Sequence, residues 1–298
     1  MPTFVLASIP FLLFFALTAG LWLILEHLIP TLVNPAHRAA RVWTRWLVRT
    51  TGLERLLSHA TRRVPRWRVY LPVIVVLIVG IVASFAAGAI FLELAEGLTD
   101  DEVELQELDE RVYIWARDLR AAHVTPFFTT LTIIGTPIGL GIIVAIVVVF
   151  LGTGKRYRWI AYLLVTTIVG GGINRLLKAF FARERPELAE MLRETTGYSF
   201  PSGHAMGSTM VFGALAYLAI RHFRTRNLRS FWVALSLSMI IAISFSRIYL
   251  GVHWMSDILA GIAAGTTWVF ATTGSYEVLR RARRLRGLGH EPPGIRNG

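Results

Sequence analysis

Seven long apolar stretches, each bounded by polar or charged residues, constrain this chain more than any other feature of its sequence. An α-helix needs about 20 predominantly apolar residues to cross the hydrocarbon core of a bilayer, where backbone polar groups must be satisfied within the segment. The pattern therefore predicts an all-α fold, a polytopic bundle of transmembrane helices. The predicted spans are residues 4–30, 70–94, 127–151, 159–181, 205–220, 231–248 and 254–278.

Composition agrees with this prediction, since 54% of the residues are hydrophobic, only 17% are charged and the mean hydropathy is +0.54. A soluble domain of this length rarely has such a balance. The chain has no cysteine, which excludes a disulfide framework, a thiolate nucleophile and a cysteine-based metal site. The net charge of +12 does not indicate nucleic acid, because the cations lie in short blocks beside apolar segments.

The loops between the predicted spans alternate in charge. The positive-inside rule places an arginine-rich loop in the cytoplasm, and the loop between the first two spans contains nine arginines and one acid, Glu54. Residues 93–118 are acidic, whereas 152–158, 221–229 and 280–286 are basic. We therefore expect the N-terminus outside, with segments 182–203 and 246–257 together on the non-cytoplasmic face.

Three regions are expected. The first span is too long for a secretory signal and no positive residue precedes it, so we interpret it as retained. Apolar side chains interleaved with arginines between 42 and 57 indicate an amphipathic helix on the cytoplasmic membrane surface. Thr99 or Asp100 can cap an acidic outer helix that ends near Arg120, to which we assign no chemistry. The regions are 1–69, a six-helix core at 70–279, and a basic cytoplasmic tail at 280–298.

The first polar cluster is the segment "KAFFARERP". Lys178 precedes Arg185 by seven residues, about two helical turns, so the two cations can share one face. Pro186 ends the helix, because its ring cannot continue the hydrogen-bond ladder. Interfacial cations that extend to the lipid headgroups are the structural alternative.

The second cluster is "YSFPSGHAMGS", which predicts a turn followed by a helix with His204 in its first turn. A helix start presents unpaired backbone N–H groups and binds anions readily. Ser202 can add a hydroxyl donor, and Gly203 permits close approach of the backbone. A capping serine with an ordinary interfacial histidine is equally compatible, whereas a nucleophilic Ser202 lacks the usual G-x-S-x-G context.

The third cluster is "SRIYLGVHWMSD". Gly251 can close one helix, which places Arg247 near its outer end and His253 at the start of the next. Asp257 follows His253 by four residues, so both project from one face. The carboxylate can accept the imidazole N–H and leave the other ring nitrogen free to attack. A structural His–Asp pair is the alternative, but it does not account for Arg247.

Taken together, the clusters combine three cations, the neutral donors of a helix start and two histidines, only one of which has a carboxylate partner. A transferring phosphoryl group carries charge on three equatorial oxygens and needs such donors. The paired His253 suits a nucleophile, and the unpaired His204 suits a general acid for the leaving oxygen.

These motifs also resemble the signature of the type 2 phosphatidic acid phosphatase superfamily, in order and without a missing position. They are Lys178-x6-Arg185-Pro186, Pro201-Ser202-Gly203-His204 and Ser246-Arg247-x5-His253-x3-Asp257. The resemblance covers about 70–278, six of the seven spans.

The resemblance implies an integral-membrane phosphatase that requires neither metal nor cofactor. In that family pattern His253 forms a phosphohistidine, Asp257 orients it, and His204 protonates the leaving group and then activates water. The residues implied to hold the phosphate are Lys178, Arg185, Ser202, Gly203 and Arg247. The implied partners are a membrane lipid phosphate and the bilayer, not nucleic acid.

The substrate is expected to be a prenyl phosphate or diphosphate, phosphatidylglycerophosphate or phosphatidic acid, with an outward site favouring the prenyl lipids. Vanadium haloperoxidases share the residue constellation but are soluble. A transporter or flippase would place polar residues near the bilayer midplane, where Asn174 and Arg175 are the main candidates. A metal site built from His and Asp is disfavoured by the neighbouring cations.

Overall fold

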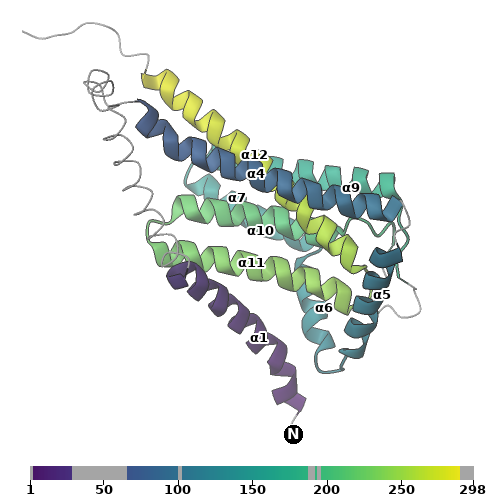
Figure 1. Cartoon of the computed structure of the whole chain (residues 1–298). Coiled ribbons are helices and arrows are strands. Elements are labelled where there is room, and N and C mark those ends of the chain that lie inside the picture. Colours follow the sequence, from purple (N-terminus) through teal and green to yellow (C-terminus); the bar gives the residue numbers. More distant parts are fainter. Residues whose placement is uncertain (1–2, 29–65, 100–102, 187–191, 193–195, 289–298) are drawn as a thin grey trace, which may run out of the picture.

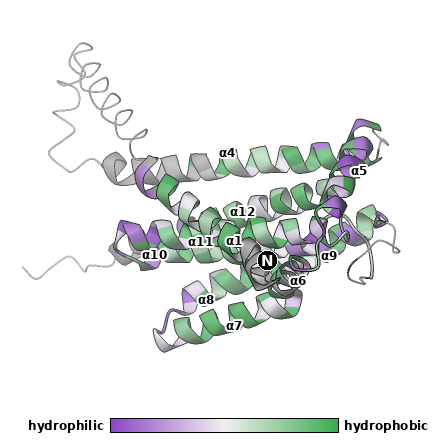
Figure 2. Cartoon of the chain, turned by 90° about the horizontal axis from the view of Figure 1, so that it is seen from below, coloured by the Kyte–Doolittle hydropathy of each residue, from purple (hydrophilic) through white to green (hydrophobic). Residues whose placement is uncertain are grey.

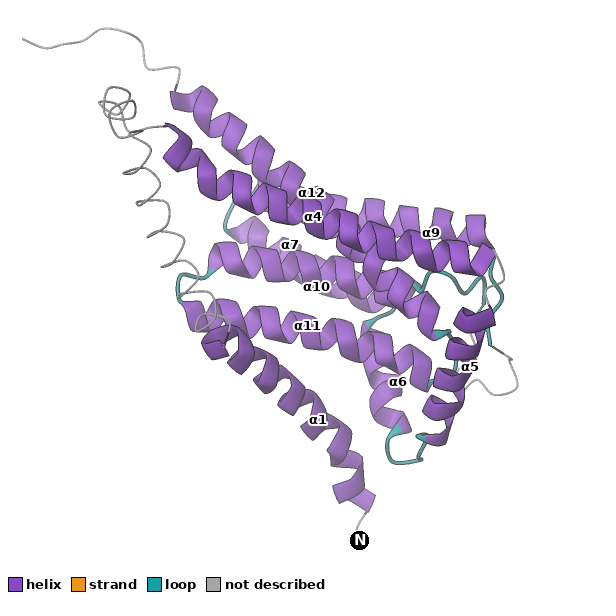
Figure 3. Ribbon diagram, in the orientation of Figure 1, coloured by secondary structure: helices purple, strands orange, loops and turns teal. Residues whose placement is uncertain are grey.

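The computed structural model describes residues 3–28, 66–99, 103–186, 192 and 196–288, and every regular element in these ranges is a helix (Figure 1). The helices run roughly side by side, and the loops lie at the two ends of the bundle (Figure 3). The elements are α1 Thr3–Leu23, η1 Ile24–Leu28, α4 Arg66–Thr99, α5 Val103–Asp118, α6 Thr125–Ile134, α7 Pro137–Thr153, α8 Tyr157–Leu164, η2 Val165–Val169, α9 Gly170–Phe181, α10 Gly203–His222, α11 Arg226–Tyr249 and α12 Met255–Leu288.

The seven apolar stretches correspond to helical segments, and the expected all-α membrane bundle is confirmed. Four segments are long and apolar enough to cross a bilayer, and a fifth qualifies if α6 and α7, which are bent by 55°, form one broken span. The four are Gly80–Leu98, Tyr157–Phe181, Gly203–His222 and Arg226–Tyr249. Over the described residues α1 and α12 do not meet that criterion, so the count of seven spans remains a prediction.

Helix α10 lies at the centre and packs closely against α12 through glycines. A methyl group on Gly261 would lie 2.8 Å from the carbonyl oxygen of Ser202, and one on Gly265 would lie 2.8 Å from Cβ of Thr209. Small residues four apart let two backbones approach in this way. The contact fixes the start of α10 against the start of α12, and these two helix starts carry the second and third polar clusters.

The two ends of the bundle differ in character. Figure 2 shows α7 as hydrophobic along most of its length and α5 as largely hydrophilic. Helix α5 lies across one end, where it contacts α11 and α12, as expected for an outer helix (Figure 1). The basic loops that join α7 to α8 and α10 to α11 lie at the other end.

Some of the sequence predictions concern residues that the structure does not describe. The amphipathic surface helix at 42–57 and most of the basic tail lie outside the described residues. The division into regions 1–69, 70–279 and 280–298 likewise stays a prediction. Helix α5 begins at Val103, a few residues after Thr99 and Asp100, and ends at Asp118 close to the predicted end.

Candidate active site

His253 and Asp257 pair as their four-residue spacing predicts. Nδ1 of His253 lies 3.1 Å from Oδ2 of Asp257, and both side chains are buried. Helix α11 ends at Tyr249 and Gly251 has a φ of +72°, a conformation that glycine adopts without strain. This turn places His253 immediately before α12, with Asp257 in the first turn of that helix.

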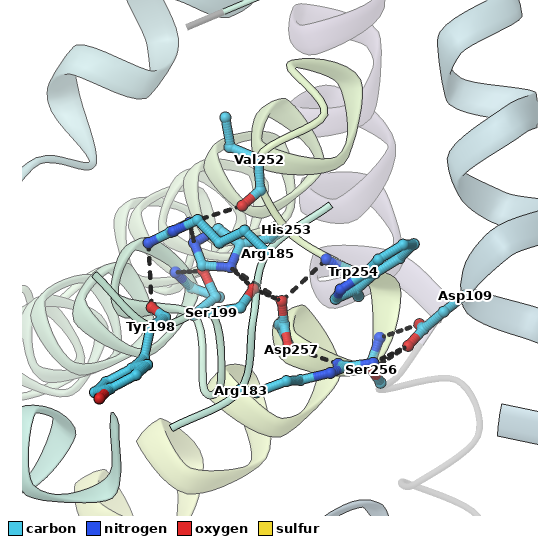
Figure 4. A network of polar contacts seen from close by, with 12 residues as sticks. Asp109, Arg183, Arg185, Tyr198, Ser199, Val252, His253, Trp254, Ser256 and Asp257 are labelled. Carbon is cyan, nitrogen blue, oxygen red and sulfur yellow. Dashed lines mark hydrogen bonds and ion pairs between the residues drawn. The ribbon is translucent and has the colours of Figure 1, made fainter. Parts of the chain in front are cut away.

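Asp257 is held from several directions (Figure 4). Its Oδ2 also accepts a hydrogen bond from the backbone N–H of Trp254 at 3.0 Å and one from the hydroxyl of Ser199. Its Oδ1 accepts one from Nη1 of Arg183 at 2.7 Å. A buried carboxylate satisfied on both oxygens keeps its charge and orientation, and so it can orient the imidazole of His253.

Arg185 faces the other ring nitrogen of His253. Its Nη1 lies 3.2 Å from Nε2 of His253 and donates to the carbonyl of Val252 at 2.7 Å. Its Nε donates to the carbonyl of Gly197 at 2.8 Å. When the imidazole proton is on Nδ1, toward Asp257, the lone pair of Nε2 points to this guanidinium. An anion bound by Arg185 would therefore lie beside Nε2.

Lys178 turns inward instead of extending to the membrane surface. Its ammonium donates to the carbonyl oxygens of Tyr198 at 2.6 Å and of Ser199 at 3.0 Å. Helix α9 ends after Phe181 with Ala182 in the left-handed conformation, at a φ of 45°. The chain then returns so that Lys178 and Arg185 both donate hydrogen bonds to the carbonyl oxygen of Tyr198.

The second cluster forms the start of α10. Ser202 is completely buried, and its hydroxyl oxygen accepts a hydrogen bond from the backbone N–H of Ala205 at 3.4 Å, the geometry of a helix cap. The backbone N–H of Ser202 donates to the carbonyl of Asp257 at 3.0 Å. His204 lies in the first turn, as expected. Capping and anion binding by the following N–H groups are compatible, so both interpretations of this motif remain open.

Arg247 enters the site from the last turn of α11. Only 3% of the residue is exposed, and its Nη1 donates to the hydroxyl of Thr132 on α6 at 2.7 Å. A buried guanidinium needs acceptors or an anion at its donors, and this one lines the same cavity as Lys178 and Arg185. The side chain is thus positioned for an anionic ligand.

One cavity of about 1060 Å³ joins most of these groups. Of the eight predicted site residues, six line it, whereas Ser202 and Asp257 do not. Its other walls are largely apolar and come from α7, from η2 with α9, and from α10. The six residues are Lys178, Arg185, Gly203, His204, Arg247 and His253.

Three residues in the polar network were not singled out from the sequence. Arg183 bridges two carboxylates, with 2.7 Å to Asp257 and 2.8 Å to Oδ2 of Asp109 on α5 (Figure 4). Asp109 also accepts a hydrogen bond from the backbone N–H of Ser256 at 2.8 Å, and Ser199 contacts both members of the His–Asp pair. For Asp109 the sequence did hold a signal, because it shares a helical face with the buried Tyr113 and Ala116.

The electrostatics favour a neutral His253 in the free protein. Burial lowers the pKa of His253 from its ordinary value, an effect that the Asp257 carboxylate opposes and the charges of Arg247 and Arg185 reinforce. A neutral imidazole has a lone pair on Nε2 at neutral pH, which nucleophilic attack requires. The site thus combines a nucleophile held by a carboxylate with cations that can bind a phosphoryl group.

Comparison with known proteins connects this site to a family. Residues 159–281 match the family model described as the PAP2 superfamily, and all eight predicted site residues lie within that region. Phosphatidylglycerophosphatase B of Bacillus subtilis is 29% identical over 201 residues, which cover 65% of this chain and 95% of that protein. The undecaprenyl-diphosphatase of Sulfolobus acidocaldarius is 35% identical over 74 residues, 25% of this chain and 31% of that protein.

A solved structure supports the fold. The crystal structure of a transmembrane PAP2-type phosphatidylglycerolphosphate phosphatase from Bacillus subtilis superposes with a TM-score of 0.60, covering 66% of this chain and 98% of that one at 24% identity. The helical membrane fold is thus confirmed, while the match of residues 159–281 to the family model confirms the resemblance inferred from the three motifs.

Proposed function

We propose that this chain, whose residues 159–281 match the PAP2 superfamily model, is an integral-membrane phosphatase that hydrolyses a lipid phosphate or diphosphate. One observation carries the proposal. The cavity that contains His253, His204 and four cations continues between the apolar faces of α7, η2 and α10. Such a cavity can hold a phosphate at one end and a hydrocarbon chain along the rest.

In the first step Nε2 of His253 attacks phosphorus. A P–N bond forms, the P–O bond to the lipid breaks, and His204 gives its proton to the leaving oxygen. Asp257, bonded to Nδ1 of His253, stabilises the positive charge on the ring. Lys178, Arg185, Arg247 and the first N–H groups of α10 bind the equatorial oxygens.

In the second step His204 takes a proton from water, which attacks the phosphohistidine. The P–N bond breaks, inorganic phosphate leaves, and His253 returns to its neutral form. Each residue then has its starting charge. None of these steps uses a metal or a cofactor.

The relatives are named for a phosphatidylglycerophosphate and for an undecaprenyl diphosphate. We propose a substrate from the same range, namely a prenyl phosphate or diphosphate, phosphatidylglycerophosphate or phosphatidic acid. We further propose that the site opens on the outer face of the cytoplasmic membrane, because it lies at the end of the bundle opposite the basic loops.

The replacement His253→Ala tests the mechanism. Purified variant protein should release phosphate from a lipid phosphate at least about a thousandfold more slowly than the wild type, because the nucleophile is lost. His222→Ala is the matched control, since His222 lies on α10 at the opposite end of the bundle and contacts Arg156. Activity should survive a chelator. Full activity of His253→Ala, or transport of labelled lipid without phosphate release by the wild type, would contradict the proposal.

A further inference from the structure

Arg175 is a cation in the cavity that neither the three motifs nor the mechanism uses. It lies on α9 within the apolar span Tyr157–Phe181, and its side chain is exposed and lines the cavity. No described residue forms a hydrogen bond or ion pair with its guanidinium. A charged side chain within a membrane span is costly, and where it lines a cavity it is by default a candidate for function.

Its place on α9 relates it to the reacting groups. Arg175 precedes Lys178 by three residues, about one turn, so it lies about 4.5 Å further into the span along the helix axis. The start of α10 packs against this part of α9, because a methyl group on Gly203 would lie 3.1 Å from Oδ1 of Asn174 and 3.7 Å from Cε of Lys178. His204 follows Gly203 directly. Arg175 is therefore on the His204 side of the cavity, toward its apolar part.

In-line attack fixes which part of the substrate occupies that side. The nucleophile His253 and the leaving oxygen lie on opposite sides of phosphorus. The leaving oxygen is next to the acid, His204, and the rest of the substrate continues from it toward the apolar walls. A group attached to the leaving oxygen thus passes Arg175 before the hydrocarbon chain begins.

The charges of the cavity point to a second anion. The described residues that line it include four cations, Arg175, Lys178, Arg185 and Arg247, and no carboxylate. Lys178, Arg185 and Arg247 are assigned to the scissile phosphate. Arg175 remains, and a guanidinium with its donors unused binds a phosphate in bidentate fashion.

We propose that Arg175 binds a second phosphate of the substrate, on the leaving-group side of the phosphate that is transferred. This inference rests on the proposed function and narrows its substrate class. The second phosphate is attached directly in a lipid diphosphate and through glycerol in phosphatidylglycerophosphate. Phosphatidic acid and prenyl monophosphates lack it.

The experiment compares two matched pairs of substrates. Farnesyl diphosphate is paired with farnesyl phosphate, and phosphatidylglycerophosphate with phosphatidic acid of the same acyl chains. For each pair the ratio of kcat/KM, two-phosphate lipid over one-phosphate lipid, is measured with purified wild type and Arg175→Gln. We expect the ratio to fall about tenfold or more in the variant for at least one pair, because a charge-assisted contact is lost.

The substrate pair whose ratio falls shows whether the second phosphate is attached to the transferred phosphate directly or through glycerol. Arg175→Lys keeps the positive charge but loses the bidentate geometry of the guanidinium, so it should give an intermediate ratio. Arg158→Gln, at the other end of the same span, is the matched control and should leave both ratios unchanged. Unchanged ratios in both Arg175 variants, or a proportional loss on every lipid, would overturn the inference. If the wild type releases phosphate from none of the four lipids, that result would instead contradict the proposed function and remove the basis of this inference.

Discussion

The guanidinium of Arg183 is shared by two buried carboxylates that are far apart in the sequence. Asp257 and Asp109 are 0% and 2% exposed, and each accepts a short charge-assisted hydrogen bond from Arg183. Two negative charges and one positive charge leave the group with a net charge of −1. That charge lies behind His253, where it can stabilise the positive ring that the proposed attack on phosphorus would form.

Replacing Asp109 with Asn tests this arrangement. After the substitution Arg183 pairs with Asp257 alone, and the net negative charge behind His253 is lost. We therefore expect kcat to fall by about tenfold. Breaking a buried ion pair from one side also costs on the order of 3 kcal/mol, which lowers the midpoint of thermal unfolding in detergent. Glu107→Gln is the control, because that exposed residue on α5 pairs with the exposed Arg111. Equal activity and stability of the two variants would show that Asp109 is dispensable.

At the scale of elements, the break between α6 and α7 shapes the leaving-group side of the site. Gly135 ends α6, Thr136 caps α7 by accepting a hydrogen bond from the backbone N–H of Gly139 at 3.0 Å, and Pro137 begins the new helix. A methyl group on Gly135 would lie 2.8 Å from Cδ2 of His204 and also too close to Cγ2 of Ile243. The broken helix therefore fits directly against the imidazole of His204.

The replacement Gly135→Ala should displace that imidazole. We expect kcat on a lipid phosphate to fall by up to about a hundredfold, the lower end of the 10² to 10⁴ that a general acid contributes, because the imidazole is displaced and not removed. Hydrolysis of p-nitrophenyl phosphate should fall less, because its leaving group departs without protonation. Gly152→Ala on α7, where no atom lies within 4 Å of the added methyl group, should behave as wild type. An equal loss on both substrates would mean that the effect is not on proton transfer.

On the scale of the whole molecule, the candidate active site and the basic loops lie at opposite ends of the bundle (Figure 1). Asp109, Arg185 and His253 are at one end. The contact of Arg156 with His222, and that of Arg280 with Glu277 at 2.6 Å, belong to the other. Because basic loops stay in the cytoplasm, we expect the catalytic end to face outward.

The absence of cysteine makes this orientation straightforward to measure. Single cysteines are introduced by Glu104→Cys on α5 and Arg224→Cys in the loop before α11, both at exposed positions. A membrane-impermeant maleimide applied to intact cells should label the first and not the second, and lysis should expose both. Labelling of only Arg224→Cys in intact cells would reverse the proposed topology.

The sequence alone predicted a large part of the fold and of the candidate site. The helical segments follow from runs of apolar residues, and the pairing of His253 with Asp257 follows from their spacing on one helix face. The turn at Ser202 and the closure of α11 near Gly251 were predicted from capping preferences. All of these are local features, because they depend on residues within a few positions of each other.

What the sequence by itself determined was the inventory of helices and of reactive side chains. Only the tertiary structure decided which distant side chains meet: Asp109 with Arg183, Thr132 with Arg247, and Arg175 with the cavity of His253. These contacts depend on how each helix is rotated and shifted against its neighbours. Local spacing leaves that rotation open, whereas close packing through residues such as Gly261 and Gly135 allows only one arrangement.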